Sequence, residues 1–118
     1  MSIRPLFAAM AVLALAGCAS DPAPNEQMRL TEQAITQAKA VGATADDMPE
    51  MKLAEAKYDR AKGNMADESY RNARMRAEQA ELDARLAEAK VLTQKSEEQV
   101  NVLNTRIVRL RKQLGDAQ

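Results

Sequence analysis

The chain has 118 residues, with 17 basic and 17 acidic side chains, no histidine, no tryptophan and one cysteine. This balance excludes the basic surface typical of nucleic-acid-binding proteins. Without histidine or a second cysteine, zinc sites of the usual kind and Ser/His or Cys/His catalysis are also excluded. We therefore expect a protein that is not an enzyme and that holds no metal or cofactor.

The first 20 residues resemble a bacterial lipoprotein signal. Arg4 precedes an apolar run over residues 5–17, which is shorter than the about 20 apolar residues of a membrane-spanning helix. Such a run between a charged start and small residues is typical of secretory signals. It ends in "LAGC" (15–18), which is similar to the lipobox. The resemblance implies removal of residues 1–17 and lipidation of Cys18 with diacylglyceryl and palmitate-type chains. An ordinary signal with an incidental cysteine is the alternative.

The residues after the cysteine bear on localisation. Ala19 departs from the aspartate that keeps enteric lipoproteins in the inner membrane. The resemblance therefore implies the outer membrane, with the chain facing the periplasm. Inner-membrane sorting is the alternative, because some bacteria read these positions differently. Pro22 and Pro24 favour an extended tether over residues 18–25.

The rest of the chain has the composition of an all-α protein. Ala, Glu, Gln, Lys, Arg, Leu and Met dominate it and are strong helix formers. Helices are predicted at residues 25–41, 49–63 and 64–114. Gly42 and Gly63 are expected to end the first two helices, and the proline at the start of the second fits its first turn. The third helix would be about 75 Å long, at 1.5 Å per residue.

The long helix carries two stripes of residues at helical spacing. One is mostly alanine: Ala66, Tyr70, Ala73, Ala77, Ala80, Ala84, Ala87 and Val91. The other alternates steps of four and three: Met75, Gln79, Leu82, Leu86, Ala89, Thr93, Ser96, Val100, Leu103, Ile107, Leu110 and Leu114. A heptad row of this length is typical of coiled coils.

The number of stripes predicts the architecture. Two stripes before residue 91 predict contacts on two sides of the helix, and one stripe after it predicts a single partner surface. We therefore expect an antiparallel, alanine-rich three-helix bundle over residues 26–91. Residues 92–118 would project as a coiled-coil-like amphipathic rod and tail.

The projecting half supplies the candidate partner-binding residues. Its apolar row is Val100, Leu103, Ile107, Leu110 and Leu114, and its cations are Arg106, Arg109, Arg111 and Lys112. We expect the apolar row to form a homo-oligomer or to bind an envelope protein. The cations would either stabilise the carboxyl end of the helix or contact an anionic surface such as peptidoglycan carboxylates.

Much of the chain resembles a family known only as a domain of unknown function. The matching stretches are "AITQAKAVGA" (34–43), "MPEMKLAEAKYDRA" (48–61), "YRNARMRAEQAELDARLAEAK" (70–90) and "RIVRLRKQL" (106–114). Family members are short helical periplasmic proteins, often lipoproteins, and some carry this module ahead of an OmpA-type domain. No such domain precedes Gln118 here. The resemblance implies no activity.

These observations predict a non-catalytic, lipid-anchored envelope protein with a structural or scaffolding role. One alternative is an accessory subunit that docks its free helix on a membrane transport or secretion complex. Another is a peptidoglycan tether like the murein lipoprotein, although this sequence ends in "GDAQ" and not in a lysine. A carrier of small hydrophobic ligands is disfavoured, because an alanine-rich bundle leaves little cavity.

Overall fold

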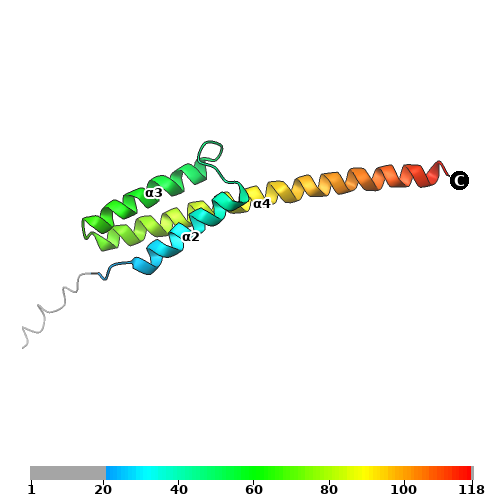
Figure 1. The fold of residues 1–118 in the computed structure, drawn as a ribbon. Helices are drawn as coiled ribbons and strands as arrows, with labels where there is room; N and C mark the ends of the chain where they lie inside the picture. Colours follow the sequence, from blue (N-terminus) through cyan, green and yellow to red (C-terminus); the bar gives the residue numbers. More distant parts are fainter. Residues whose placement is uncertain (1–20, 118) are drawn as a thin grey trace, which may run out of the picture.

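The computed structural model describes residues 21–117, which form three α-helices and no strand. Helix α2 spans Asn25–Val41, α3 spans Pro49–Ala66 and α4 spans Tyr70–Gly115 (Figure 1). The predicted signal and Cys18 lie outside the described residues. The all-α prediction is confirmed.

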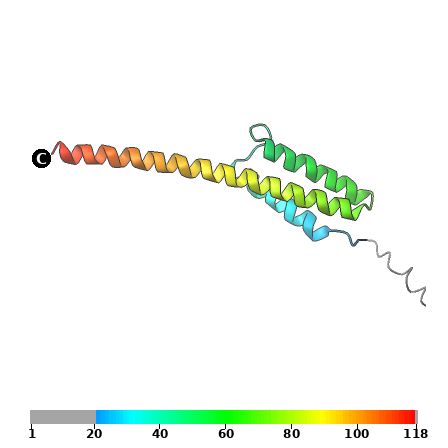
Figure 2. The same ribbon diagram turned by 180° about the vertical axis from the view of Figure 1, so that it is seen from behind.

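Helix α4 runs the length of the molecule, and the two shorter helices lie along its first half (Figures 1 and 2). Both make most of their contacts with α4 and few with each other. The second half of α4 extends beyond the bundle, so the molecule measures 109 Å in one direction and 33 and 18 Å in the others. A helical bundle with a projecting rod is therefore confirmed.

Helix α2 begins and ends where the sequence predicts. Gly42 follows it with a φ of 104°, in the left-handed region that glycine adopts without strain. The Gly42 N–H donates to the Lys39 carbonyl and the Ala43 N–H to the Ala38 carbonyl, both at 2.9 Å. This pair of bonds is the Schellman arrangement, and it satisfies carbonyls that the helix end leaves free.

The predicted boundary between the second and third helices is wrong. Helix α3 continues through Gly63 to Ala66, and α4 begins only at Tyr70. Glu68 makes the turn with a φ of 56°, while the N–H of Ser69 donates to the Asn64 carbonyl at 2.8 Å. A non-glycine residue thus takes the left-handed position that ends the helix. Glycine positions in the sequence therefore do not mark this helix end.

The length of α4 follows from this boundary. It has 46 residues, or about 69 Å at 1.5 Å per residue, and not the predicted 50 residues. Ala66, assigned to the first stripe of the long helix, is instead the exposed last residue of α3.

The bundle core is made of alanine. Five alanines of α4 are fully buried: Ala73, Ala77, Ala80, Ala84 and Ala87. Ala84 and Ala87 form one core cluster with Ala34, Ile35 and Ala38 of α2 and with Met51 and Ala54 of α3. Because alanine side chains are short, the three helices approach closely. The prediction that this stripe is packing surface is confirmed for these five positions.

One polar residue is buried in this core. Thr31 of α2 is fully buried, and its hydroxyl lies 3.0 Å from the Ala77 carbonyl of α4 and 2.8 Å from its own helix's Gln27 carbonyl. Both carbonyls can accept the hydroxyl proton, so the group is satisfied. The contact fixes α2 against α4 at one level.

Within residues 21–117, no helix combines the length and apolarity needed to cross a bilayer.

A candidate partner-binding face on α4

The second stripe of α4 forms one exposed face along the helix, which we call the apolar face. Its members are Met75, Gln79, Leu82, Leu86, Ala89, Thr93, Ser96, Val100, Leu103, Ile107, Leu110 and Leu114. The larger aliphatic members are all exposed, from 45% at Ile107 to 71% at Leu114. The apolar face therefore begins on the bundle and continues along the rod.

The prediction that both stripes make contacts within the bundle is wrong. Helices α2 and α3 both lie on the alanine stripe, and Met75, Leu82 and Leu86 of the apolar face stay exposed. The alanines face away from the apolar face, because they occupy positions about half a turn round the helix. The bundle thus uses one side of α4 and leaves the other free.

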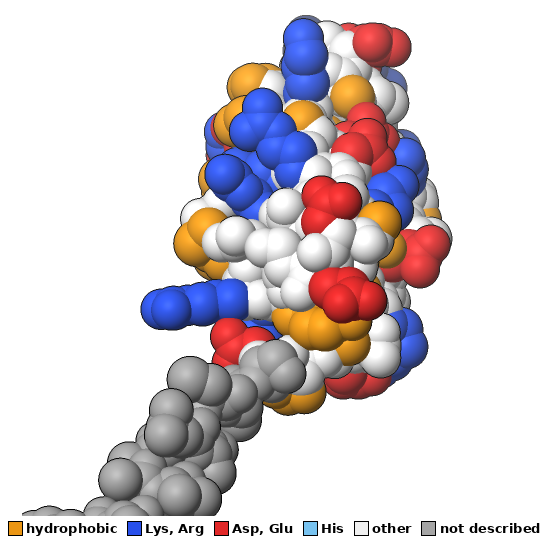
Figure 3. Space-filling view, turned by 90° about the vertical axis from the view of Figure 1, so that its left-hand side faces the viewer, with side chains coloured by type: hydrophobic (Ala, Val, Ile, Leu, Met, Phe, Trp, Pro, Cys, Tyr) orange, Lys and Arg blue, Asp and Glu red, His pale blue; other side chains and the backbone are white. Residues whose placement is uncertain are grey.

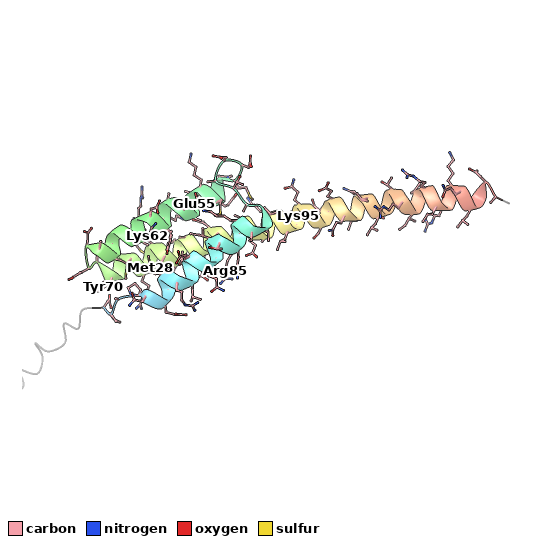
Figure 4. All side chains as sticks on the ribbon, viewed as in Figure 1. Met28, Glu55, Lys62, Tyr70, Arg85 and Lys95 are labelled. Atoms are coloured by element: carbon pink, nitrogen blue, oxygen red, sulfur yellow. The ribbon has the colours of Figure 1, made fainter. Side chains whose placement is uncertain are left out.

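The bundle ends near residue 95. Val91 is half-buried, and every described residue after it is exposed. Lys95 makes the last contact, donating from Nζ to the Val41 carbonyl at 2.6 Å, where the end of α2 meets α4 (Figure 4). Beyond it the side chains of α4 project into solvent on all sides (Figure 4).

All nine predicted partner-binding residues lie on this free part of α4. The apolar row from Val100 to Leu114 is exposed, as are the cations at 106, 109, 111 and 112. Among the ion pairs of residues 21–117, none involves these four cations. The arrangement offers contact surface and charge and does not enclose a small molecule.

Sequence reasoning missed part of this surface. The two-sided bundle that the sequence predicts would bury Leu82 and Leu86, although the same heptad spacing links them to the rod. Leu92, Val102 and Val108 are exposed aliphatic residues beside the row, and they fall outside its four–three spacing. The heptad pattern therefore identifies Leu82 and Leu86 as partner-binding residues but does not identify Leu92, Val102 and Val108.

Charged pairs join the three helices around the bundle. Glu81 of α4 accepts hydrogen bonds from Arg85, at 2.7 Å, and from Gln27 of α2, also at 2.7 Å. These donors, Arg85 foremost, hold the pKa of Glu81 below its usual value. Lys57 of α3 meets Asp83 at 2.6 Å.

A further charged pair joins the first turn of α3 to α4. Lys90 of α4 donates to Glu50 in the first turn of α3, which lowers the pKa of Glu50.

Acidic and basic side chains both cover the outer end of the bundle (Figure 3). The described residues contain no group of three His, Cys, Asp or Glu side chains placed to hold a metal ion.

Comparison with protein families finds one match. The family described as "Domain of unknown function (DUF4398)" matches residues 26–103. The chain belongs to the DUF4398 family. The match spans α2, α3 and α4 as far as Leu103, so it includes the bundle and the first part of the rod.

A solved structure is similar to this DUF4398 protein. It is the crystal structure of a DUF4398 family protein from Pseudomonas aeruginosa PAO1, with 65% sequence identity and a TM-score of 0.78. The match covers 82% of this chain and 100% of that chain. Comparison with curated proteins gave no match.

Proposed function

We propose that this protein is a non-catalytic, lipid-anchored structural protein of a bacterial envelope, at the periplasmic face of the outer membrane. The observation that carries the proposal is the exposed apolar face. A helix that holds aliphatic side chains in water over the length of a rod serves contact with another macromolecule, because exposed apolar patches of this extent mark interaction sites.

The position of the chain start supports an anchored role. The described chain begins at the outer end of the bundle, and the rod leaves from the other end (Figure 1). A lipid on Cys18, three residues before the described chain, would therefore hold the bundle end at the membrane. Covalent acyl chains bind a bilayer with about 0.8 kcal/mol per buried CH₂, so three chains suffice for a stable anchor.

The composition supports a role without chemistry. The chain has no histidine and one cysteine, and that cysteine falls in the lipobox. The charged groups of the bundle pair with one another across its surface. Pairs of this kind hold helices together, which is a structural use of charge.

Labelling with an alkyne-bearing palmitate tests the anchor. We expect wild-type protein to take up label and to fractionate with the outer membrane, and Cys18→Ser to do neither. The matched control is the double variant Cys18→Ser/Ser20→Cys, which keeps one cysteine but breaks the motif, and we expect no label. Equal labelling of all three chains would contradict the lipid anchor.

Envelope integrity tests the structural role. Cells that lack the protein should become more sensitive to bile-salt detergents, and wild-type protein should restore resistance. Cys18→Ser should fail to restore it, since an unanchored rod cannot link components to the membrane. Unchanged sensitivity without the protein would contradict a structural role and favour the accessory-subunit alternative, for which one stoichiometric partner should co-purify in mild detergent.

A further inference from the structure

We propose that the apolar face of α4 binds a second copy of this protein in an antiparallel pair, with the tip of each rod lying on the other copy's bundle. This deepens the proposed function by naming the partner of the rod. It does not need the lipid anchor, so the two proposals can fail separately.

Heptad positions along the apolar face favour two helices. Taking Val100 as position a, the a residues of the rod are Val100, Ile107 and Leu114, and the d residues are Leu103 and Leu110. The flanking e and g residues of the rod, such as Gln99, Asn104 and Arg106, are polar, so the apolar stripe is the narrow seam of a coiled coil. One further helix therefore covers the face.

The charges beside the face oppose a parallel pair in register. In that arrangement a g residue of one helix meets the e residue five positions later on the other. The charged pairs would then be Glu78 with Asp83, Arg85 with Lys90 and Arg106 with Arg111. All three are like-charged, and the two basic tips would also lie together. Like charges placed in this way suppress a pairing.

Side-chain size also opposes the parallel pair. The middle of the apolar face is small, with Ala89, Thr93 and Ser96. In a parallel pair each would meet its own copy and leave a poorly filled stretch between two well-filled ones. Voids of this kind lose the contacts that hold a core together.

An antiparallel pair fills the same stretch. With Leu82 opposite Leu114 of the second copy, Leu86 meets Leu110. The small residues then meet large ones, in the order Ala89 with Ile107, Thr93 with Leu103 and Ser96 with Val100. Large and small side chains facing one another interdigitate well. This register pairs every small residue between 89 and 96 with a larger one and pairs leucine with leucine at the two ends.

The same register separates the two basic tips and places Arg111 near a carboxylate of the second copy. Arg111, at position e, lies within two residues of the level of Asp83, also at e, on the second copy. Arg106, at position g, lies within two residues of the level of Leu92, also at g. These cations flank the apolar face at positions e and g, where they border the contact. Each basic tip thus leaves the other tip, so the two sets of cations no longer lie together.

The bundle leaves room for this partner. Helices α2 and α3 lie on the alanine side of α4, and Leu82 and Leu86 on the other side are exposed. An overlap from residue 82 to residue 114 extends about 50 Å at 1.5 Å per residue. The pair would have one bundle at each end, so its two tethers would leave from opposite ends.

Residues 21–118 are the unit to test. The bonds that hold α2 and α3 on α4 join residues between 27 and 95. The crystallised chain of the Pseudomonas relative matches 82% of this chain over its own full length. The unit lacks Cys18, so cysteines introduced into it are its only thiols.

Disulfide formation between single-cysteine variants tests orientation and register. We expect Leu82→Cys mixed with Leu114→Cys to give a disulfide-linked pair, and neither variant alone to do so, since like residues would lie about 48 Å apart. The matched control is Leu82→Cys mixed with Val100→Cys, on the same face but about 21 Å out of level, and it should not cross-link.

Three results would overturn the proposal. Leu114→Cys that links to itself would show a parallel pair. A cross-link in the control mixture but not in the first would show another register. Sedimentation of wild-type residues 21–118 as a monomer at millimolar concentration would show that a different protein covers the face. All variants change exposed residues, and circular dichroism should confirm unchanged helicity.

Discussion

Leu82 and Ala84 lie two residues apart on α4, and the larger side chain is the exposed one while the smaller one is buried. Leu82 is 68% exposed and Ala84 is fully buried. The reason is that both short helices pack on the alanine side of α4, where only a small side chain fits between them. In most cores a buried leucine contributes more to the free energy of folding than a buried alanine does. Here the buried alanine holds the bundle together.

Substitutions at these two positions should therefore have the reverse of their usual effects. Ala84→Leu should destabilise the bundle by about 1–3 kcal/mol, because a larger side chain forces the helices apart. Leu82→Ala should change the stability of dilute monomer by less than about 0.5 kcal/mol. Urea unfolding of residues 21–118 at low micromolar concentration measures both. A larger loss for Leu82→Ala would contradict this description of the core.

Two glycines should respond oppositely to alanine. Gly42 has a φ of 104°, and Gly63 lies inside α3 with open space around the position of a Cβ atom. Gly42→Ala should destabilise the fold by about 1 kcal/mol or more through backbone strain. Gly63→Ala should stabilise it by about 0.5–1 kcal/mol, since alanine favours the helix. Thermal unfolding followed by circular dichroism tests both, and a stabilised Gly42→Ala would show that the turn after α2 tolerates other backbones.

The sequence predicted what local patterns determine. Composition gave the helices, Gly42 and Pro49 marked boundaries, and spacing identified the alanine core. It could not show that Glu68 would take the left-handed turn position, because this depends on how α3 and α4 meet. Nor could it decide which stripe the short helices cover. Both stripes have helical spacing, and only close packing selects the alanines over Leu82 and Leu86.

Acid should weaken the bundle through two carboxylates. The pKa values of Glu81, bonded by Arg85 and Gln27, and of Glu50, bonded by Lys90, are lowered from the usual 4.5. A lowered pKa in the folded state means that the stabilisation is complete above the unfolded value and is lost as pH falls through the folded one. Stability should therefore stay level from pH 7 to about 5 and fall below about 4.5.

Variants separate this effect from general acid unfolding. Glu81→Gln should lose stability at pH 7 and lose less on acidification than wild type does. Glu97→Gln, on the rod away from the bundle, is the matched control and should keep the wild-type pH profile. Unfolding by urea at several pH values gives the comparison. Parallel profiles for all three chains would show that Glu81 contributes nothing to the acid dependence.

The cations of the tip give a test whose sign depends on the orientation of the pair. In the antiparallel arrangement Arg111 borders the partner's Asp83, so Arg106→Gln/Arg111→Gln should weaken association. Border ion pairs contribute about 0.2–0.5 kcal/mol each, and two per pair correspond to a roughly two- to fivefold weaker association. In a parallel pair the same change would remove a repulsion and strengthen association.

A second double variant supplies the control for charge at the helix end. Arg109→Gln/Lys112→Gln removes the same charge from the same turns of α4, but these positions lie away from the apolar face, so association should change less. Any loss from the helix dipole is then common to both variants. Sedimentation at low and high salt measures the constants, and the wild-type constant should fall with salt. Equal association constants for all three chains would show that the cations play no part in self-association. They would then act on the helix end or on an anionic surface such as peptidoglycan.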